Sequence, residues 1–262
     1  MKFVIRQYQD SDRQQVIDLI LSIQQGEFNI PITIEDQPDV KNIPQSYQKG
    51  NGNFWVATAE DRVVGTIGLI DIGKNQVALR KMFVHQNYRG KEIGVAKLLL
   101  TELIASCLNN GVSEILLGTI DRMKAAHRFY EKFGFKEIQK VTLPDNFPVM
   151  GVDNTFYALS IKEDFLIYHI VSVTDWNKFE SVDYYEAPSL ASEGFIHCSK
   201  RNQIEGVLER YYANFTNLLL LHINPLLLAA ELKFEQATNQ EFFPHVFGRI
   251  NKNSILEVEG LI

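Results

Sequence analysis

The chain has few cysteines, no long apolar run and no excess of positive charge. Its 262 residues include two cysteines, Cys107 and Cys198. That number does not support the disulfide framework of a small secreted domain, and we expect both to be free thiols. No apolar stretch reaches the roughly 20 residues that a membrane-spanning helix needs. The net charge of −6 argues against a general nucleic-acid binder.

The composition is that of a folded globular protein. Apolar residues make up 45% of the chain and charged residues 22%, which argues against disorder. The first residues, Met1 to Arg6, alternate like a strand and lack the apolar segment and cleavage site of a signal peptide. We therefore expect a cytoplasmic protein with no nucleic-acid or membrane partner.

Strand and helix patterns alternate over the first 160 or so residues. Helical spacing of Val16, Ile20 and Ile23 predicts a first helix, followed by a loop at 26–52 with one short helix. Further helices are predicted at 91–108, with Gly111 as its C-cap, and at 124–133. Strands are predicted at 2–8, 54–59, 63–70, 77–84, 114–120, 135–141 and 155–161. This order predicts a mixed α/β (α+β) fold with a mixed central sheet.

A short charged break, Lys162-Glu163-Asp164, is the best candidate for a domain boundary. It predicts one domain at 1–162 and a smaller α+β domain at 163–262. In the second domain a strand should start at Phe165 and others should lie at 195–198, 218–223 and 255–258. Its helices are predicted near 175–180, 203–212 and 225–232.

The most informative segment joins a predicted strand to a predicted helix. It reads Val84-His-Gln-Asn-Tyr-Arg-Gly-Lys-Glu-Ile-Gly-Val95. A helix start leaves backbone N–H groups unpaired and carries a partial positive charge, so this junction is suited to binding an anion. The alternative is a solvated Arg-Gly turn that binds nothing.

A second segment, Ala125-Ala-His-Arg-Phe-Tyr-Glu-Lys-Phe-Gly-Phe135, follows another apolar strand. In this order the two segments resemble the signature motifs of the GCN5-related N-acetyltransferase (GNAT) superfamily. The resemblance covers roughly residues 1–162 and implies the GNAT acyl-CoA N-acyltransferase fold. It also implies direct transfer of an acetyl group from acetyl-CoA to the primary amine of a small molecule or peptide, in a ternary complex and without a metal.

The resemblance places the cofactor along the first motif. Backbone N–H groups of the turn would bind the pyrophosphate, and the preceding strand would pair with the pantetheine amides. Two positions depart from the family pattern, Glu92 in place of a glycine and Met123 in place of an asparagine, and we expect each to alter one contact. The cofactor-binding residues that the resemblance implies are Met82, Phe83, Val84, Arg89, Gly90, Lys91, Ile93, Gly94, Val95 and Phe129.

Tyr130 aligns with the tyrosine that the family uses as a general acid. A neutral phenol, with a pKa of about 10, can donate a proton to the departing thiolate. The competing interpretation is a core tyrosine that packs beside its aromatic neighbours. Two candidates remain for the general base: Asp71, at the end of a strand, and His85, after the cofactor strand.

An acidic loop lies where the superfamily usually binds its acceptor. Its residues are Glu27, Glu35, Asp36 and Asp39. Their charge would favour a cationic amine, although such loops are more often simply solvated.

The C-terminal part contains Ile167-Tyr-His-Ile170, Gly194-Phe-Ile-His-Cys-Ser199 and Phe243-Pro-His-Val-Phe-Gly248. In this order the three segments resemble a family of small bacterial and plant proteins without established activity. They supply the candidate ligand-binding residues His169, His197, Ser199 and His245. Three histidines can hold a metal, but the local spacing of metal ligands is missing, and we favour structural roles and expect no metal.

A distant similarity to ADP-ribosyltransferase-type folds gives an alternative interpretation. There His169, His197 and Ser199 would contact NAD, with Glu241 as an acid, although no glycine-rich dinucleotide motif is present. In this alternative the first domain senses acetyl-CoA without transferring its acyl group and regulates a C-terminal domain that binds a nucleotide-like ligand. Either interpretation is compatible with a homodimer.

Overall fold

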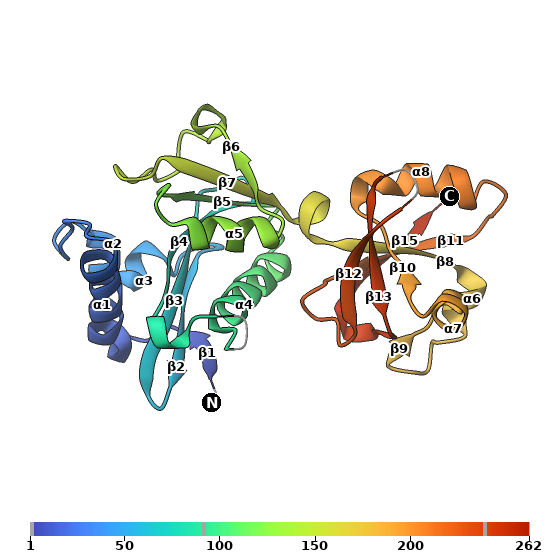
Figure 1. The fold of residues 1–262 in the computed structure, drawn as a ribbon, viewed down its shortest axis with the longest axis horizontal. Coiled ribbons are helices and arrows are strands. Elements are labelled where there is room, and N and C mark those ends of the chain that lie inside the picture. Colours follow the sequence, from blue (N-terminus) through green and yellow to red (C-terminus); the bar gives the residue numbers. More distant parts are fainter. Residues whose placement is uncertain (1–2, 91–92, 238–239, 262) are drawn as a thin grey trace. The chain divides into compact units, whose positions relative to one another are not determined.

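The computed structural model describes residues 3–90, 93–237 and 240–261. The chain divides into two compact units, Met1–Ser160 (unit 1) and Ile161–Ile262 (unit 2) (Figure 1). The predictions for Lys91 and Glu92 fall outside the described residues. Within those residues no helix combines the length and the apolar character needed to cross a membrane.

Unit 1 is built on a seven-stranded sheet with the order β1-β2-β3-β4-β5-β7-β6. Neighbouring strands are antiparallel except β4 and β5, which are parallel. The mixed central sheet predicted from the sequence is thus confirmed. The strands are β1 (Val4–Gln7), β2 (Asn53–Ala59), β3 (Arg62–Asp71), β4 (Gln76–Val84), β5 (Glu114–Thr119), β6 (Lys136–Ile138) and β7 (Thr155–Ser160).

Helices cover both faces of this sheet (Figure 1). On one face, α1 (Arg13–Leu21) and the segment Ser22–Glu27 bury the predicted apolar residues Val16, Ile20 and Ile23 in a core cluster against the sheet. On the other face, α4 (Val95–Asn109) packs closely on β3, because a Cβ atom at Gly65 would lie 2.9 Å from Leu99 Cδ1. The predicted loop at 26–52 contains two short helices, α2 (Pro38–Lys41) and α3 (Ile43–Ser46).

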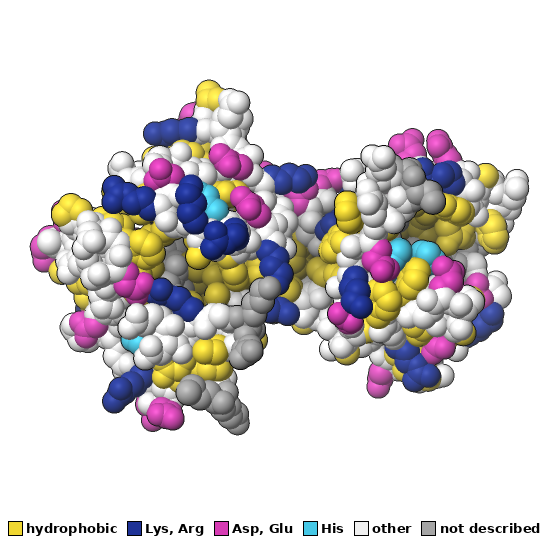
Figure 2. Space-filling model, in the orientation of Figure 1, with side chains coloured by type: hydrophobic (Ala, Val, Ile, Leu, Met, Phe, Trp, Pro, Cys, Tyr) yellow, Lys and Arg dark blue, Asp and Glu magenta, His cyan; other side chains and the backbone are white. Residues whose placement is uncertain are grey.

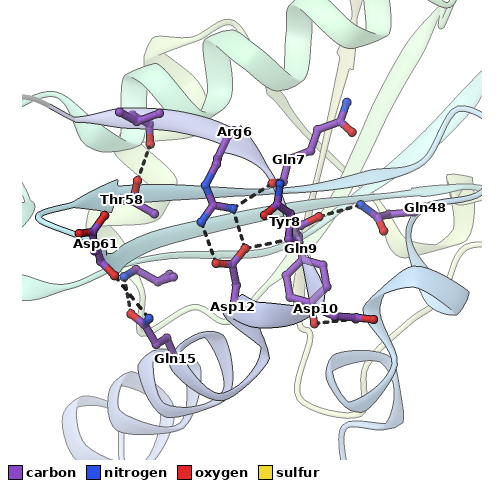
Figure 3. Close-up of polar contacts among 12 residues, drawn as sticks. Arg6, Gln7, Tyr8, Gln9, Asp10, Asp12, Gln15, Gln48, Thr58 and Asp61 are labelled. Atoms are coloured by element: carbon purple, nitrogen blue, oxygen red, sulfur yellow. Dashed lines mark hydrogen bonds and ion pairs between the residues drawn. The ribbon is translucent and has the colours of Figure 1, made fainter.

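The start of α1 is fixed to the sheet by a hydrogen-bonded ion pair (Figure 3). Arg6 of β1 donates two hydrogen bonds of 2.7 Å to the carboxylate of Asp12, which also accepts one of 2.9 Å from the Gln9 N–H. Burial opposes ionisation of Asp12, but these hydrogen bonds outweigh it and lower the pKa of the carboxyl. Gln15 of α1 donates to the carbonyl of Asp61 in the β2–β3 turn. These contacts position the helix that leads into the acidic loop.

Within the described residues, unit 2 contains two three-stranded antiparallel sheets and a short pair of strands. A β-bridge between Tyr168 and Ser199 joins the two sheets through backbone hydrogen bonds of 2.9 and 2.7 Å. The sheets are β15-β11-β8, from Ile255–Leu261, Leu218–Ile223 and Ile167–Ser172, and β10-β13-β12, from Ile196–His197, Phe242–Phe247 and Glu231–Gln236. The short pair is β9 (Tyr184–Tyr185) with β14 (Ile250–Asn251), and the helices are α6 (Val173–Asn177), α7 (Pro188–Glu193) and α8 (Ile204–Tyr211).

The prediction of a helix at 225–232 is wrong. Residues 225–230 form turns and bends, and the chain then enters β12. The Asn224 side chain accepts a hydrogen bond of 3.0 Å from the Leu226 N–H. The Asn251 side chain accepts from the Ala229 N–H and donates to the Leu227 carbonyl, both at 2.8 Å. Side-chain hydrogen bonds to the backbone therefore replace those a helix would make, and they override the helix propensity of the leucines and alanines.

Candidate functional site

The parallel strands β4 and β5 separate partway along their length. Their pairing ends at Leu79 and Leu117, although β4 continues to its last residue, Val84. The separation coincides with a bulge in β4, where Lys81 adopts a left-handed φ of +50° and the register to β3 shifts. Thr66 Oγ1 donates a hydrogen bond of 2.7 Å to the Lys81 carbonyl and fixes the bulge. The last residues of β4 thus lie beyond its paired stretch with β5, as an added amide chain requires.

The turn from β4 into α4 relies on two glycines. Gly90 and Gly94 have φ values of +108° and +73°, a region that favours glycine. The Gly94 N–H donates to the Gly90 carbonyl at 3.1 Å, and α4 then begins at Val95, later than predicted. The first N–H groups of this 15-residue helix have no carbonyl partner within the helix and form the positive end of its dipole. The junction therefore has an open helix start, with Ile93, Gly94 and Val95 at it, and anion binding there stays a prediction.

The side chain of Arg89 makes hydrogen bonds to other groups of the protein. Its Nε donates to the Val84 carbonyl at 2.6 Å, and its terminal nitrogens donate to the Glu27 carboxylate at 2.6 and 2.8 Å. The Arg89 backbone N–H donates to the Gln86 carbonyl at 3.3 Å. Bidentate pairs of this kind fix geometry. Arg89 therefore holds the turn against β4 and the end of Ser22–Glu27, and the cofactor contact that the resemblance implies for it stays a prediction.

The acidic loop has no carboxylate without a partner among the described residues. Burial lowers the pKa of Lys81, whose ammonium group donates to Gln37 Oε1 at 2.7 Å and lies 3.3 Å from Asp39. Three of the four carboxylates thus have a cationic partner, which reduces the attraction to a cationic amine, whereas Asp36 stays an exposed charge. The partners are Arg89 for Glu27, Lys41 for Glu35, Thr33 for Asp36, and Tyr47 and Lys81 for Asp39.

Tyr130 lies on α5 (Lys124–Lys132), the helix that follows β5. Its ring contacts Phe135 and Tyr157, and the half-buried Phe129 packs on its edge. Only 6% of the residue is exposed, and its hydroxyl accepts or donates no hydrogen bond within the described residues. Burial raises the pKa of Tyr130, so the phenol is protonated at neutral pH. Both α4 and α5 follow the carboxyl ends of the neighbouring parallel strands, which places their starts at the same edge of the sheet.

The structure separates the two candidates for the general base. Asp71 pairs with Val77 at the far end of β4, about 23 Å from Val84 at about 3.3 Å per residue. Its carboxylate accepts from the N–H groups of Asn51 and Gly73 and holds that end of the hairpin. His85 directly follows β4, and its Nδ1 accepts a hydrogen bond of 3.3 Å from the Asn87 N–H. Only His85 lies at the edge that holds the α4 and α5 starts.

Sequence reasoning noted Met123 as a departure from the family pattern but missed two other residues near this edge, Asn154 and Thr66. Met123 is the N-cap residue of α5, and its sulfur lies 3.9 Å from Thr119 Oγ1. The Asp121 N–H in the same turn donates to Asn154 Oδ1 at 2.9 Å, and Asn154 is distant in the sequence. Thr66 was missed because alternation along β3 carries no signal for a bulge in its neighbour.

Unit 2 contains a pocket of about 480 Å³. The four C-terminal candidates, His169, His197, Ser199 and His245, all line it, so the structure brings together residues that are far apart in the sequence. Glu241 is not among the lining residues. Further side chains come from β8, from α8 and from β13, and they include Tyr168, Arg210, Tyr211 and Phe243.

His169 is a buried structural residue of this pocket. Its Nδ1 donates to the His197 carbonyl at 2.7 Å, and its Nε2 accepts from the Tyr185 hydroxyl at 3.0 Å. Burial lowers the pKa of His169 to about 4, so the ring is neutral at pH 7. With both nitrogens in use, it has none left for a metal. Among the described residues no group of three or more His, Cys, Asp or Glu is placed to hold one.

His197 and His245 lie opposite each other on β10 and β13, with ring centroids 5.0 Å apart. Each has an acidic partner, Glu193 at 3.0 Å and Glu235 at 2.7 Å. Figure 2 shows histidine surface in unit 2 with acidic side chains on either side. Burial raises the pKa of the adjacent Cys198 thiol, which makes it a poor nucleophile.

Comparisons with known proteins match both units. A family model described as "Acetyltransferase (GNAT) domain" matches residues 50–137, and one described as "Protein of unknown function (DUF952)" matches residues 170–258. N-acetylaspartate synthetase of Xenopus tropicalis is 42% identical over 102 residues, which are 38% of this chain and 37% of that protein. Probable N-acetyltransferase family 8 member 5 of Mus musculus is 32% identical over 109 residues, 40% and 47% of the two chains. The chain thus spans less than half the length of these curated relatives.

Two solved structures match unit 1 over their full length or nearly so. An acetyltransferase of the GNAT family from Staphylococcus aureus Mu50 is 42% identical and covered completely, with 62% of this chain aligned and a TM-score of 0.59. An acetyltransferase from Streptococcus agalactiae 2603 is 29% identical and covered to 98%, with 60% of this chain aligned and a TM-score of 0.58. These matches confirm both resemblances found in the sequence. Through unit 1 the chain belongs to the GNAT family of acetyltransferases, and its C-terminal part matches the DUF952 family.

Proposed function

We propose that the chain is an N-acetyltransferase that uses acetyl-CoA and acts in unit 1. The observation that carries this proposal is the separation of β4 from β5 beside the open start of α4. The first feature offers backbone groups to an amide chain, and the second offers N–H dipoles to a diphosphate. Coenzyme A contains both, joined in one molecule. The similarity to proteins named N-acetyltransferases supports the same conclusion.

The pantetheine arm would pair with β4 beyond the bulge, along Met82, Phe83 and Val84. The diphosphate would accept hydrogen bonds from N–H groups around Ile93 and Val95 at the start of α4. These donors are fixed in place before the ligand arrives, so binding requires little reorganisation. The binding scheme depends on backbone groups and tolerates the departure from the family pattern at Met123.

The reaction that fits this arrangement is direct attack of the amine nitrogen on the thioester carbonyl. The C–N bond forms, the C–S bond breaks, and the sulfur leaves as a thiolate that needs a proton. Tyr130 holds its proton at neutral pH and can donate a hydrogen bond, and then the proton, to that sulfur. His85 would take the proton of the amine, directly or through water. Burial raises the pKa of Cys107 to about 12, which argues against a covalent thiol intermediate in unit 1.

The acceptor would be a small-molecule or peptide amine. Because three of the four carboxylates of the acidic loop have cationic partners, a polycationic acceptor gains little attraction there. Aspartate is a reasonable first amine to test, since relatives are named N-acetylaspartate synthetase. Other amino acids and simple primary amines complete a suitable panel.

The test is incubation of the full chain with acetyl-CoA and each amine, with release of free thiol and the acetylated product both measured. We expect at least one amine to give equal amounts of thiol and product. If coenzyme A binds but no amine in a broad panel is acetylated, the alternative is favoured, in which unit 1 senses acetyl-CoA and regulates unit 2.

A further inference from the structure

The pocket of unit 2 contains polar groups that acetyl transfer in unit 1 does not use. We propose that it binds a small organic anion with a flat ring, whose phosphate or carboxylate group contacts Arg210 and Ser199. Its volume of about 480 Å³ lies within the range of small-molecule sites and exceeds what an inorganic ion fills.

The charge of the pocket favours an anion. Of the described residues that line it, Arg210 is the one with a permanent charge, and the carboxylates of Glu193 and Glu235 are hydrogen-bonded to lining histidines. No ion pair within the described part of the chain involves Arg210. Its guanidinium lies over Gly206, where an added Cβ would be 3.4 Å from the Arg210 terminal nitrogen. Arginine binds phosphate and carboxylate groups through two parallel hydrogen bonds, so an arginine without an acidic partner at this position suits either group.

Ser199 provides a second, independent indication of a ligand. The residue is 6% exposed and lines the pocket, yet its hydroxyl has no hydrogen-bond partner among the described residues. Its backbone is held by two hydrogen bonds to Tyr168. Because Ser199 Oγ has no such partner and keeps some contact with solvent, it opens onto the pocket. The hydroxyl is therefore a donor that a bound anion could use.

Aromatic side chains provide the surface for a ring. Tyr211 is 69% exposed although it lines the pocket, so it lies at the mouth. The hydroxyls of Tyr168 and Tyr212 donate to the carbonyls of Lys162 and Ile170, at 2.7 and 3.3 Å. Tyr168 is only 1% exposed, so the apolar wall of the pocket is formed by the rings of Tyr212 and Phe243. A flat ring bound between this wall and Tyr211 would gain stacking contacts.

The test is calorimetric titration of the full chain with AMP, inorganic phosphate, benzoate and adenosine. Excess coenzyme A is present to occupy unit 1, because coenzyme A itself carries adenine and phosphates. We expect AMP or benzoate to bind under these conditions, and to bind more tightly than inorganic phosphate or adenosine. Which of the two binds distinguishes a phosphate from a carboxylate.

Three variants locate the site. Arg210→Gln should weaken binding at least about tenfold, and Ser199→Ala about threefold or more, as expected for loss of a charge-assisted and a neutral hydrogen bond. Lys178→Gln removes the same charge elsewhere on unit 2 and should bind like the unmodified chain. Arg210→Lys, which keeps the charge without the planar group, should fall between Arg210→Gln and the unmodified chain.

Several results would overturn the proposal. One is that neither AMP nor benzoate binds at millimolar concentration. Another is that the heat of binding disappears when coenzyme A is added while Arg210→Gln, without coenzyme A, binds AMP like the unmodified chain, because the signal then belongs to unit 1. The proposal would also fail if adenosine bound as tightly as AMP and benzoate did not bind. It would fail as well if Arg210→Gln and the unmodified chain bound with equal affinity. Thermal unfolding of each variant shows whether a loss of binding reflects a loss of folding.

Discussion

The candidate site of unit 1 is made mainly of backbone groups, whereas the pocket of unit 2 is made of side chains. In unit 1 the bulge at Lys81 and the glycine turn before α4 expose amides, while charged neighbours such as Arg89 are tied up in ion pairs. In unit 2 the pocket offers the side chains of Arg210 and Ser199. A site of the first kind tolerates side-chain changes, and one of the second kind depends on single residues. We expect the activity of unit 1 to depend on the side chain of Tyr130.

The largest effect is therefore expected from Tyr130→Phe. Loss of the phenol hydroxyl should lower kcat by about 10²–10⁴-fold, the usual contribution of a general acid, and should leave the affinity for acetyl-CoA nearly unchanged. Steady-state kinetics together with equilibrium binding of acetyl-CoA would measure both. Because burial raises the pKa of Tyr130, the rate of the unmodified enzyme should show no loss from this group until above pH 10.

Tyr157→Phe is the matched control, since Tyr157 belongs to the same aromatic cluster and its hydroxyl contacts His127 and Glu131. It should retain most of the activity. Equal loss of turnover in both variants would mean that the cluster acts through packing, and Tyr130 would lose its chemical role.

The next effect concerns the pH dependence of unit 2. Folding lowers the pKa of His169 to about 4 from the usual value near 6.5. As the pH falls through this interval, the unfolded chain takes up a proton that the folded unit does not, so stability falls. The free energy of unfolding should decrease by up to about 3 kcal/mol between pH 7 and pH 4, with no contribution from His169 above pH 7.

Trp176 can report this change, because it packs against Tyr185, the hydrogen-bond partner of His169. A Trp55→Phe background removes the other tryptophan. Denaturant unfolding monitored by tryptophan fluorescence should show the loss of stability as the pH falls. In the His169→Gln variant this loss should be smaller. Stability that stays level from pH 7 to pH 4.5 would contradict the assigned burial and neutral state of this ring.

The smallest expected effect comes from replacing a glycine at either end of α4, which distinguishes a loss of stability from a loss of coenzyme A binding in unit 1. Gly94 and Gly111 lie at opposite ends of α4 with similar φ values, +73° and +67°. Alanine at either position should cost about 1–2 kcal/mol of stability, because a Cβ atom is disfavoured in the left-handed region. Only Gly94→Ala should also weaken coenzyme A binding, by several-fold, since it disturbs the start of the helix. Calorimetric titration of both variants with coenzyme A measures the two affinities. If the affinities are equal, the start of α4 does not belong to the binding site.

The sequence predicted the candidate site best where the residues of the site are contiguous in the chain. The glycine-containing turn before α4 and the motif around Tyr130 are continuous segments, and both were recognised with the fold around them. In unit 2 the three histidine segments were identified, but their convergence on one pocket needed the β10–β13 pairing, which lies beyond local pattern. Arg210 gave no signal, because a charged residue on a predicted helix usually faces solvent.

The remaining differences come from tertiary contacts that override local preference. Residues 225–230 have the composition of a helix, but the side chains of Asn224 and Asn251 bind their backbone. The Arg89 side chain, suited to a phosphate, donates two hydrogen bonds to the Glu27 carboxylate, a contact that the sequence did not predict. In each case the deciding partner is a single polar side chain whose position depends on the folded chain.

Amide hydrogen exchange with and without coenzyme A tests most directly whether unit 1 binds its cofactor through backbone groups. We predict slower exchange on adding coenzyme A at Met82–Val84 and at the first residues of α4, with the pocket of unit 2 unaffected. Protection that appears elsewhere, or unchanged exchange in these two segments despite saturating coenzyme A, would contradict the account.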